Sequence, residues 1–148
     1  MTRQSAAHDL ITGLIARTNQ LGITRQDLAD ALGVSICTVN GWYRGAWLPS
    51  FARAVAWAQH IGLRLAVVLD GRVCSEGAAI PGDLMQLRRS RGLLQKDVAA
   101  RGRTRREVIY TRERNRREPG LAMVHDHVTL LGYQLTLLRA RQTEAVGV

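Results

Sequence analysis

Residues 23–45 read ITRQDLADALGVSICTVNGWYRG, and this stretch predicts two short helices joined by a tight turn. Thr24 is suited to cap the first helix, because Asp27 follows three residues later in the capping-box position. Gly33 is suited to end that helix in a left-handed conformation, and Ser35 is suited to cap the second. We therefore expect two helices separated by only a few residues.

Both expected helices have an apolar face. The inner stripe of the first helix consists of Leu28, Ala31 and Leu32. The second helix runs to about Arg44, with Val39 and Trp42 pointing inward. Its outward residues are Ile36, Cys37, Asn40 and Gly41. Apolar residues at helical spacing also predict a helix over 8–20 and another that starts at Pro49.

Two short helices around a glycine-containing turn form a helix-turn-helix. Residues 23–35 and the positions that follow resemble the lambda-repressor and Cro family of DNA-binding domains. The matching later residues are Thr38, Val39, Trp42, Arg44, Gly45, Pro49 and Ser50. Counted from the expected helix over 8–20, the helix that follows Ser35 is the third of the unit. The resemblance implies that this third helix enters the major groove of DNA. Family members usually carry glutamine where Arg25 stands, but Arg25 could still hold a phosphate, with Gln26 beside it.

The sequence repeats internally without a gap, so that Asp27 falls on Asp97 and Pro49 on Pro119. We call two positions that the repeat matches, 70 residues apart in the chain, counterparts. Further matches are Leu28-Ala29 with Val98-Ala99, Arg44 with Arg114, Ala52 with Ala122, and Ile61-Gly62-Leu63 with Leu131-Gly132-Tyr133. Because these positions are mostly apolar, turn-forming or helix-capping, we expect one fold used twice. The expected organisation is a first unit over 1–69, a linker over 70–82 and a second unit over 83–148.

The second copy departs from the family pattern at the turn. Gln95 stands at the glutamine position, but Gly102 comes one place early and Arg103 replaces the turn glycine. Thr104 and Glu107 have the spacing of a new capping box. We therefore expect the third helix of this copy to begin one residue sooner than in the first.

The charge of the chain favours a polyanionic partner. Lys and Arg number 21 against 12 Asp and Glu, a net charge of +9, and Lys96 is the only lysine. The segment 88–117 alone carries a net +9, so the rest of the chain is close to neutral. Arginine is the side chain suited to bidentate phosphate and guanine contacts. A nucleic-acid surface is expected in this segment, against the alternative of a solvated helical face.

The outward faces of the two third helices differ in chemistry. Asn40 is suited to the N6 and N7 atoms of adenine, with small or apolar neighbours for thymine methyl groups. Arg105 and Arg106 are suited to guanine edges or to paired phosphates. In the first copy the expected DNA-contacting residues are Arg25, Gln26, Ser35, Ile36, Cys37, Thr38, Asn40, Gly41 and Arg44. In the second copy they are Gln95, Lys96, Arg105, Arg106, Tyr110, Thr111, Arg114, Arg116 and Arg117.

Each helical unit is followed by a strand-like segment, over 63–69 and over 133–138. A lone strand exposes unpaired amides, so these two are expected to pair in an antiparallel ribbon that relates the copies by a pseudo-two-fold axis. Two alternatives remain: pairing across a homodimer, and a small hairpin closed by Asp70-Gly71 before Arg72-Val73. The expected fold is mainly α, with two tandem helix-turn-helix units, each followed by a short strand.

Several function classes are not expected. Cys37 and Cys74 are too few for a disulfide framework, and we expect both to be reduced packing residues. No apolar window is long enough for a membrane span, and the first residues lack the apolar core of a signal peptide, which favours the cytoplasm. His125 and His127 point apart on an expected helix, so we expect no metal site. Without a phosphate loop or nucleophile motif, we expect neither an enzyme nor a cofactor.

Together these observations predict a sequence-specific transcription regulator that binds double-stranded DNA, most simply a repressor. The compact two-unit form resembles temperate-phage immunity repressors or Cro-like regulators of a GC-rich bacterial host. The operator should be asymmetric if one chain binds as a pseudo-dimer, and palindromic if a strand-mediated homodimer binds. The alternative is an antitoxin-like regulator, or a DNA-binding protein whose second unit or strands grip a protein partner.

Overall fold

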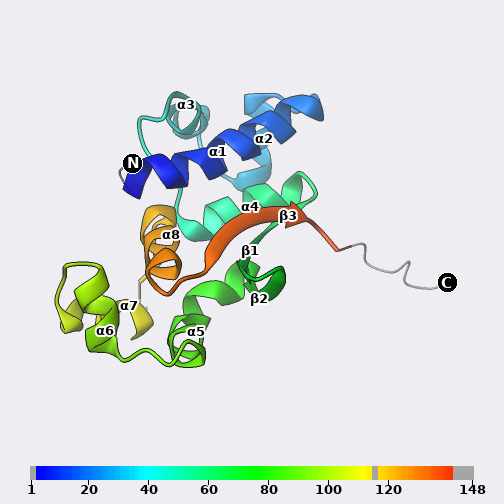
Figure 1. Ribbon diagram of the computed structural model, residues 1–148. Helices are drawn as coiled ribbons and strands as arrows, with labels where there is room; N and C mark the ends of the chain where they lie inside the picture. Colours follow the sequence, from blue (N-terminus) through cyan, green and yellow to red (C-terminus); the bar gives the residue numbers. More distant parts are fainter. Residues whose placement is uncertain (1–2, 115–116, 142–148) are drawn as a thin grey trace.

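The computed structural model describes residues 3–114 and 117–141. The described chain is mainly helical, with a small three-stranded antiparallel sheet (Figure 1). The first part contains α1 (Arg3–Gln20), α2 (Arg25–Leu32), α3 (Ile36–Arg44), α4 (Phe51–His60) and β1 (Leu63–Leu69). The middle contains β2 (Arg72–Glu76), the 3₁₀ helix η1 (Gly77–Asp83) and α5 (Leu84–Ser90). The last part contains α6 (Gln95–Arg101), α7 (Arg106–Arg114), α8 (Leu121–Leu130) and β3 (Gln134–Arg139).

Helices α2 and α3 begin and end at the predicted capping residues. At the start of α2 the Asp27 N–H donates to Thr24 Oγ1 (3.1 Å), and the Thr24 N–H donates to Asp27 Oδ2 (3.3 Å). Gly33 ends this helix with φ 68°. At the start of α3 the Thr38 N–H donates to Ser35 Oγ (3.1 Å). These local hydrogen bonds satisfy amide groups that a helix terminus would otherwise leave without a partner.

Ala31, which we expected on the inner stripe of its helix, is exposed, and so are Cys37 and Cys74, which we expected to be packing residues. The buried residues of α2 are Leu28 and Ala29, so the inward face of this helix is centred on these two positions and not on Ala31. Cys37 lies on the outer face of α3 and Cys74 lies in β2, and both are free thiols.

The sheet has the strand order β2-β1-β3, and β1 is antiparallel to both neighbours. The pairing of β1 with β3 confirms the predicted ribbon between the strands of the two copies. Its register places Ala66 opposite Thr136, and these two positions are counterparts in the repeat. In an antiparallel pair, a position that faces its own counterpart marks the two-fold axis between the strands.

A second self-pairing lies just before α4 and α8. Ser50 and Gly120 form an isolated antiparallel bridge, and they too are counterparts in the repeat. The flanking backbone hydrogen bonds run from Phe51 N to Pro119 O (2.9 Å) and from Leu121 N to Pro49 O (3.4 Å). These two bonds exchange with each other when the two copies are exchanged. The backbone therefore follows one pseudo-two-fold axis that passes through both self-pairings.

The segment 70–82 is structured, so the expectation of a linker is wrong. Asp70 (φ 49°) and Gly71 (φ 76°) form the turn between β1 and β2, as the hairpin alternative proposed. The 3₁₀ helix η1 then buries Ile80 and Pro81 completely or nearly so. Because these apolar residues are few and adjacent, they produce no periodicity in the sequence.

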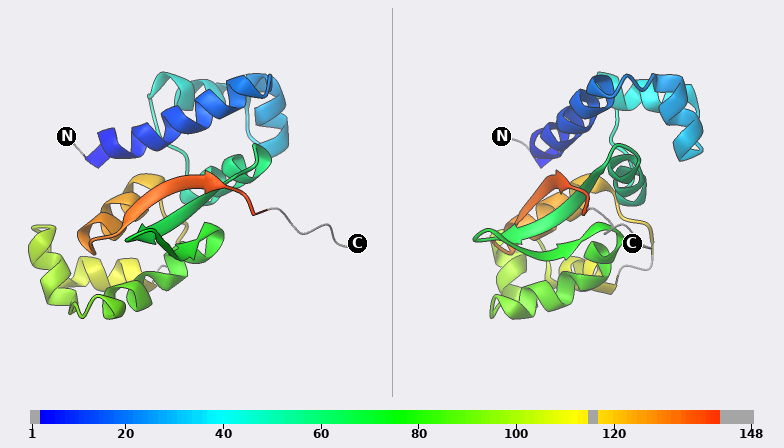
Figure 2. Two further views of the ribbon diagram at one scale, coloured as in Figure 1. Left: turned by 45° about the vertical axis from the view of Figure 1, so that its right-hand side comes forward. Right: turned by 90° about the vertical axis from the view of Figure 1, so that its right-hand side faces the viewer.

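The two copies share one core, in which buried apolar residues of both form a single cluster. Helix α1 of the first copy contacts α8 of the second, and Figure 2 shows α1 lying along the side of the sheet that carries β3. Within the described residues, no helix combines the length and apolar character that crossing a membrane requires.

The turn before α7 has the same length as the turn before α3. Helix α7 begins at Arg106, the counterpart of Ile36 where α3 begins, so the expectation of an earlier start is wrong. The physical reason is that Arg103 adopts the left-handed conformation (φ 51°) that Gly33 adopts in the first copy (φ 68°). A residue with a Cβ atom is strained in that conformation, whereas glycine is not.

We expect Arg103→Gly to raise the free energy of unfolding by about 1 kcal/mol, because it removes this backbone strain. Gly33→Ala should lower it by about 1 kcal/mol for the opposite reason. Urea denaturation of both variants and the parent protein measures the two changes. A destabilised Arg103→Gly variant would contradict this account of the turn.

Candidate nucleic-acid interface

Helices α3 and α7 lie on the same side of the molecule. In Figure 1 both are to the left of the sheet, with α3 above and α7 below. This placement follows from the pseudo-two-fold axis, because α7 occupies the counterpart positions of α3. Helix α2 contacts α3, and α6 contacts α7 in the corresponding way.

In the first copy, Arg25 braces Asn40. The Arg25 Nη1 group donates to Asn40 Oδ1 (3.1 Å), and the guanidinium lies 4.5 Å from the ring centroid of Tyr43. Arg25 therefore connects α2 to the outer face of α3. The adjacent Gln26 does not join this pair, because its amide donates to Asp30 Oδ1 on its own helix (2.9 Å).

The other expected residues of α3 divide by exposure. The Ser35 and Thr38 hydroxyls lie 3.0 Å apart at the start of the helix, where Ser35 also forms the cap. Ile36 is half-buried, whereas Cys37 and Arg44 are exposed.

The structure corrects the expected DNA contact at Gly41. It faces outward on α3, but it is buried because the indole of Trp47 lies against it. A Cβ atom at position 41 would overlap the indole ring, so only glycine permits this packing. Trp47 itself is 49% exposed. The side chain on this part of the face is therefore that of Trp47, which sequence reasoning missed, although a glycine inside a helix is a signal of close packing.

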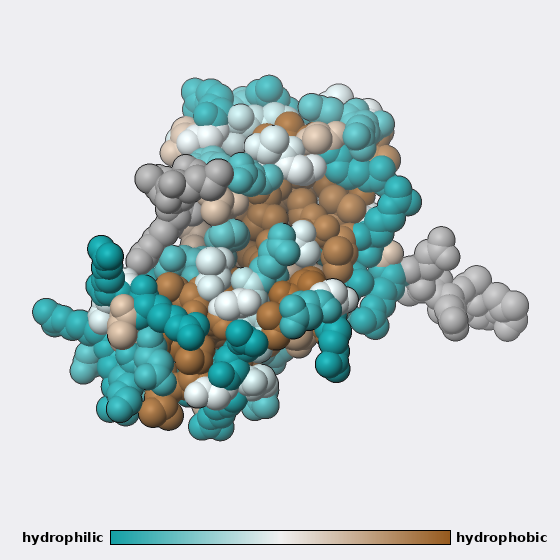
Figure 3. All heavy atoms as spheres, viewed as in Figure 1, coloured by the Kyte–Doolittle hydropathy of each residue, from teal (hydrophilic) through white to brown (hydrophobic). Residues whose placement is uncertain are grey.

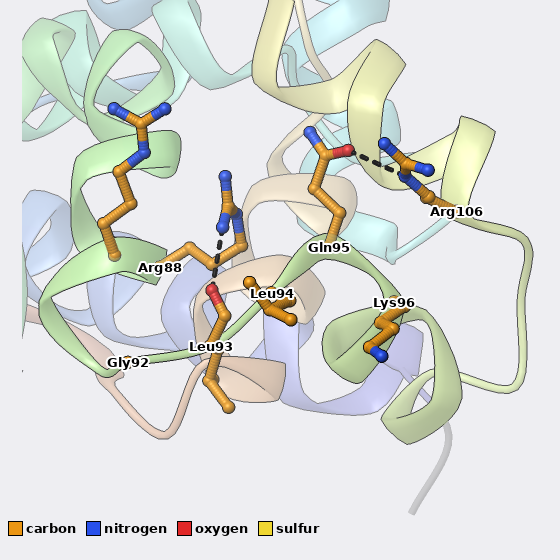
Figure 4. A pocket seen from close by; sticks show the side chains of 8 residues that line it. Arg88, Gly92, Leu93, Leu94, Gln95, Lys96 and Arg106 are labelled. Atoms are coloured by element: carbon orange, nitrogen blue, oxygen red, sulfur yellow. Dashed lines mark hydrogen bonds between the residues drawn. The ribbon is translucent and has the colours of Figure 1, made fainter.

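In the second copy, a series of contacts connects the core to Arg106, and Figure 4 shows the last of them, between Gln95 and Arg106. The buried Arg88 forms an ion pair with Glu113, with 2.9 Å between Nη2 and Oε1. Gln95 donates to the Glu113 carboxylate (3.4 Å) and accepts from Arg106 Nε (3.3 Å). Arg106 is thus held from α6, as Asn40 is held from α2.

These contacts lie beside a cationic cavity of about 670 Å³. Its lining residues are Arg88, Arg89, Gly92, Leu93, Leu94, Gln95, Lys96 and Arg106. The cavity is large enough to admit a phosphate group with its solvent, and the cations Arg89, Lys96 and Arg106 in its lining suit one.

The remaining candidates of the second copy lie along α7 and after it. The Arg114 guanidinium lies 4.8 Å from the ring centroid of Tyr110, which is itself exposed. The Thr111 hydroxyl donates to Glu107 O (2.8 Å) on the same helix. The other exposed candidates are Lys96, Arg105 and Arg117. Arg116 lies outside the described residues.

Part of the positive charge of 88–117 is neutralised inside the protein. Arg88 pairs with Glu113, and Arg112 Nη1 lies 3.3 Å from Asp126 Oδ2. The exposed cations of this segment that remain include Arg89, Arg91, Lys96, Arg101, Arg103, Arg105, Arg106, Arg114 and Arg117. Figure 3 shows hydrophilic side chains gathered over the α6 and α7 region at the lower left. The surface therefore keeps a strongly basic region on the second copy.

The two copies support their outer helices with different core chemistry. In the first copy Trp57 donates from Nε1 to Thr18 Oγ1 (2.9 Å) and stacks on Tyr43, with 6.0 Å between the ring centroids. The counterparts of Thr18, Tyr43 and Trp57 in the second copy are Arg88, Glu113 and His127. An aromatic cluster in one copy is thus replaced by charged and titratable groups in the other.

His127 is fully buried, and neither ring nitrogen has a hydrogen-bond partner among the described residues. Burial, and after it the nearby charge of Arg112, lowers the pKa of His127 from 6.5 to about 4. The folded protein therefore holds this imidazole neutral over a range in which the unfolded chain protonates it.

We expect the free energy of unfolding to fall as the pH drops from 6.5 to 4, because the unfolded chain gains a proton there that the folded chain excludes. Full protonation corresponds to a loss of about 3 kcal/mol. His127→Phe should remove this part of the pH dependence, while the matched control His60→Phe, at an exposed position, should retain it. Denaturant unfolding across this pH range makes the measurement, and parallel curves for parent and His127→Phe would contradict the expectation.

No three His, Cys, Asp or Glu side chains gather as a metal site would require within the described residues, and both His125 and His127 lie in α8. Comparison with family models, with curated proteins and with solved structures finds no match to this chain.

Proposed function

We propose that this protein is a sequence-specific regulator of transcription that binds double-stranded DNA, most simply as a repressor. In this proposal α2 with α3, and α6 with α7, are two helix-turn-helix units of the lambda-repressor and Cro type, as in temperate-phage immunity repressors. The observation that carries it is the pair of self-pairings at Ser50–Gly120 and Ala66–Thr136. They relate α3 and α7 by two-fold symmetry, which matches the symmetry of the DNA backbone.

Electrostatics supports the proposal. Exposed arginines cluster on the second copy, and neutralising phosphates with such residues releases counterions. The affinity should therefore fall as salt rises, with a logarithmic slope of roughly −0.9 for each phosphate contacted. Salt dependence reports charge alone, so it does not by itself identify a sequence-specific protein.

The two proposed reading helices carry unlike groups, Asn40 in the middle of α3 and Arg106 at the start of α7. Asn40, braced by Arg25, presents an amide, and Arg106, braced by Gln95, presents a guanidinium. An amide suits adenine and a guanidinium suits guanine in the major groove. A single chain acting as a covalent pseudo-dimer should therefore prefer an asymmetric operator.

Repression by keeping polymerase off a promoter requires DNA binding alone, with no cofactor. We place the protein in the bacterial cytoplasm, bound to operator DNA.

The second candidate function is binding of a protein partner through the sheet. β1 is the central strand, so β2 and β3 form the two edges of the sheet, and the outer edge of β2 is the one considered for this purpose. Val73 is 38% exposed and Cys74 is also exposed on that strand, and an open strand edge can add a partner strand.

The deciding experiment selects bound sequences from a random duplex library and then measures the mass of the complex on the preferred site. An asymmetric motif longer than about one helical turn, bound by one chain, is the expected result. A palindrome bound by two chains would replace the pseudo-dimer with a homodimer. The absence of any enriched motif would overturn the proposal and favour the protein partner.

On the selected site, Arg106→Ala should relax base preference in one half and cost about 1 to 3 kcal/mol at the preferred base. Asn40→Ala should do the same in the other half. Arg72→Ala, an exposed position in β2, is the matched control and should change neither half. Competition binding against single-base variants of the site measures all three. Equal weakening of Arg106→Ala on every sequence would identify Arg106 as a phosphate contact instead.

A further inference from the structure

We infer that Trp47 is a specificity-determining residue of the first copy, and that its indole contacts a thymine methyl group in the major groove. This inference rests on the proposed function and adds to it a residue that lies outside the reading helix.

The position of the indole carries the inference. Gly41 faces outward near the middle of α3, and the Trp47 ring lies directly against its backbone. An indole so placed occupies the space that a side chain at position 41 would take. Any DNA groove that admits the outer face of α3 therefore meets Trp47 at Gly41, one helical turn after the exposed Cys37.

The exposure of the Trp47 ring indicates a contact that forms only when a partner binds. Trp47 is 49% exposed, whereas Trp42 and Trp57 are 2% and 0% exposed and stack on each other within the core. A large apolar ring left half in water gains free energy when a partner covers it.

Thymine is the base that offers such a partner, because its C5-methyl group is the apolar group that a base pair presents in the major groove. The immediate surroundings of the indole agree with an apolar contact. Cys37, one turn before Gly41 on α3, carries no charge, whereas Arg44, one turn after Gly41, is exposed and suits a phosphate beside the same groove.

The second copy lacks this arrangement. Thr111 and Arg117 are the counterparts of Gly41 and Trp47, so a hydroxyl and a guanidinium replace the glycine and the indole. The methyl contact should therefore exist in only one half of the operator, the half bound by the first copy.

The test uses the full-length protein and its selected DNA site, with each thymine replaced in turn by uracil, which removes only the methyl group. One substitution, in the half that also responds to Asn40→Ala, should weaken binding about fourfold, the equivalent of one buried methyl group. Trp47→Ala should weaken binding to the parent site and abolish the effect of that uracil. Arg117→Ala, the matched control in the second copy, should leave the uracil effect intact.

A second variant tests the position of the indole without removing the tryptophan. Gly41→Ala adds a Cβ atom that must displace the indole, while alanine favours the helix. It should also abolish the uracil effect. Because the other two tryptophans are buried, the fluorescence of Trp47 should respond to DNA in the parent protein, and this response should disappear in Trp47→Phe.

The outcomes separate this inference from the proposed function. A selected motif whose binding is unaffected by every uracil, or by Trp47→Ala, overturns the role of Trp47 and leaves the DNA-binding function standing. Tighter binding by Trp47→Ala also overturns it, because the indole would then obstruct the groove. Failure to enrich any motif overturns both.

Discussion

The register of β1 against β3 is the constraint on which the rest of the structure depends. With Ala66 opposite Thr136, the two copies share a two-fold axis, and the same axis passes through the Ser50–Gly120 bridge. A slip of one residue would turn the inward side chains of β3 outward and move the axis away from the bridge. The relative placement of α3 and α7 therefore follows from a ribbon of backbone hydrogen bonds to which neither helix contributes.

The shared backbone carries two different solutions to the support of an outer helix. In the first copy stacked rings hold Arg25, which holds Asn40. In the second copy a buried ion pair holds Gln95, which holds Arg106. A buried ion pair contributes little net stability but fixes geometry, because either charge alone would be costly in the core. The second copy thus gives up packing of aromatic rings and gains a rigid support for an arginine.

Elements with local signals could be predicted from the sequence. The capping residues of α2 and α3 act over three residues of chain, so their spacing is visible without a fold. The pairing of β1 with β3 was predictable because both are apolar strands at repeat positions, and a lone strand exposes unpaired amides. The 70–82 segment was not, since Ile80 and Pro81 are buried by the hairpin and helices that surround them and by no periodicity of their own. The left-handed Arg103 was likewise missed, because tertiary packing overrides the preference of a residue with a Cβ atom.

By itself, the sequence determined the capped helices α2 and α3 and the internal repeat, because each depends on spacing along the chain, and it favoured the pairing of β1 with β3. It also marked the outer faces of α3 and α7, through the position of their apolar residues. Only the tertiary structure decided which groups occupy those faces. It placed Trp47 over Gly41, and it withdrew Arg88 and Arg112 from the surface into pairs with acidic residues. Such contacts join residues from different elements, and their distances are set by the packing of the whole core and not by separation in the sequence.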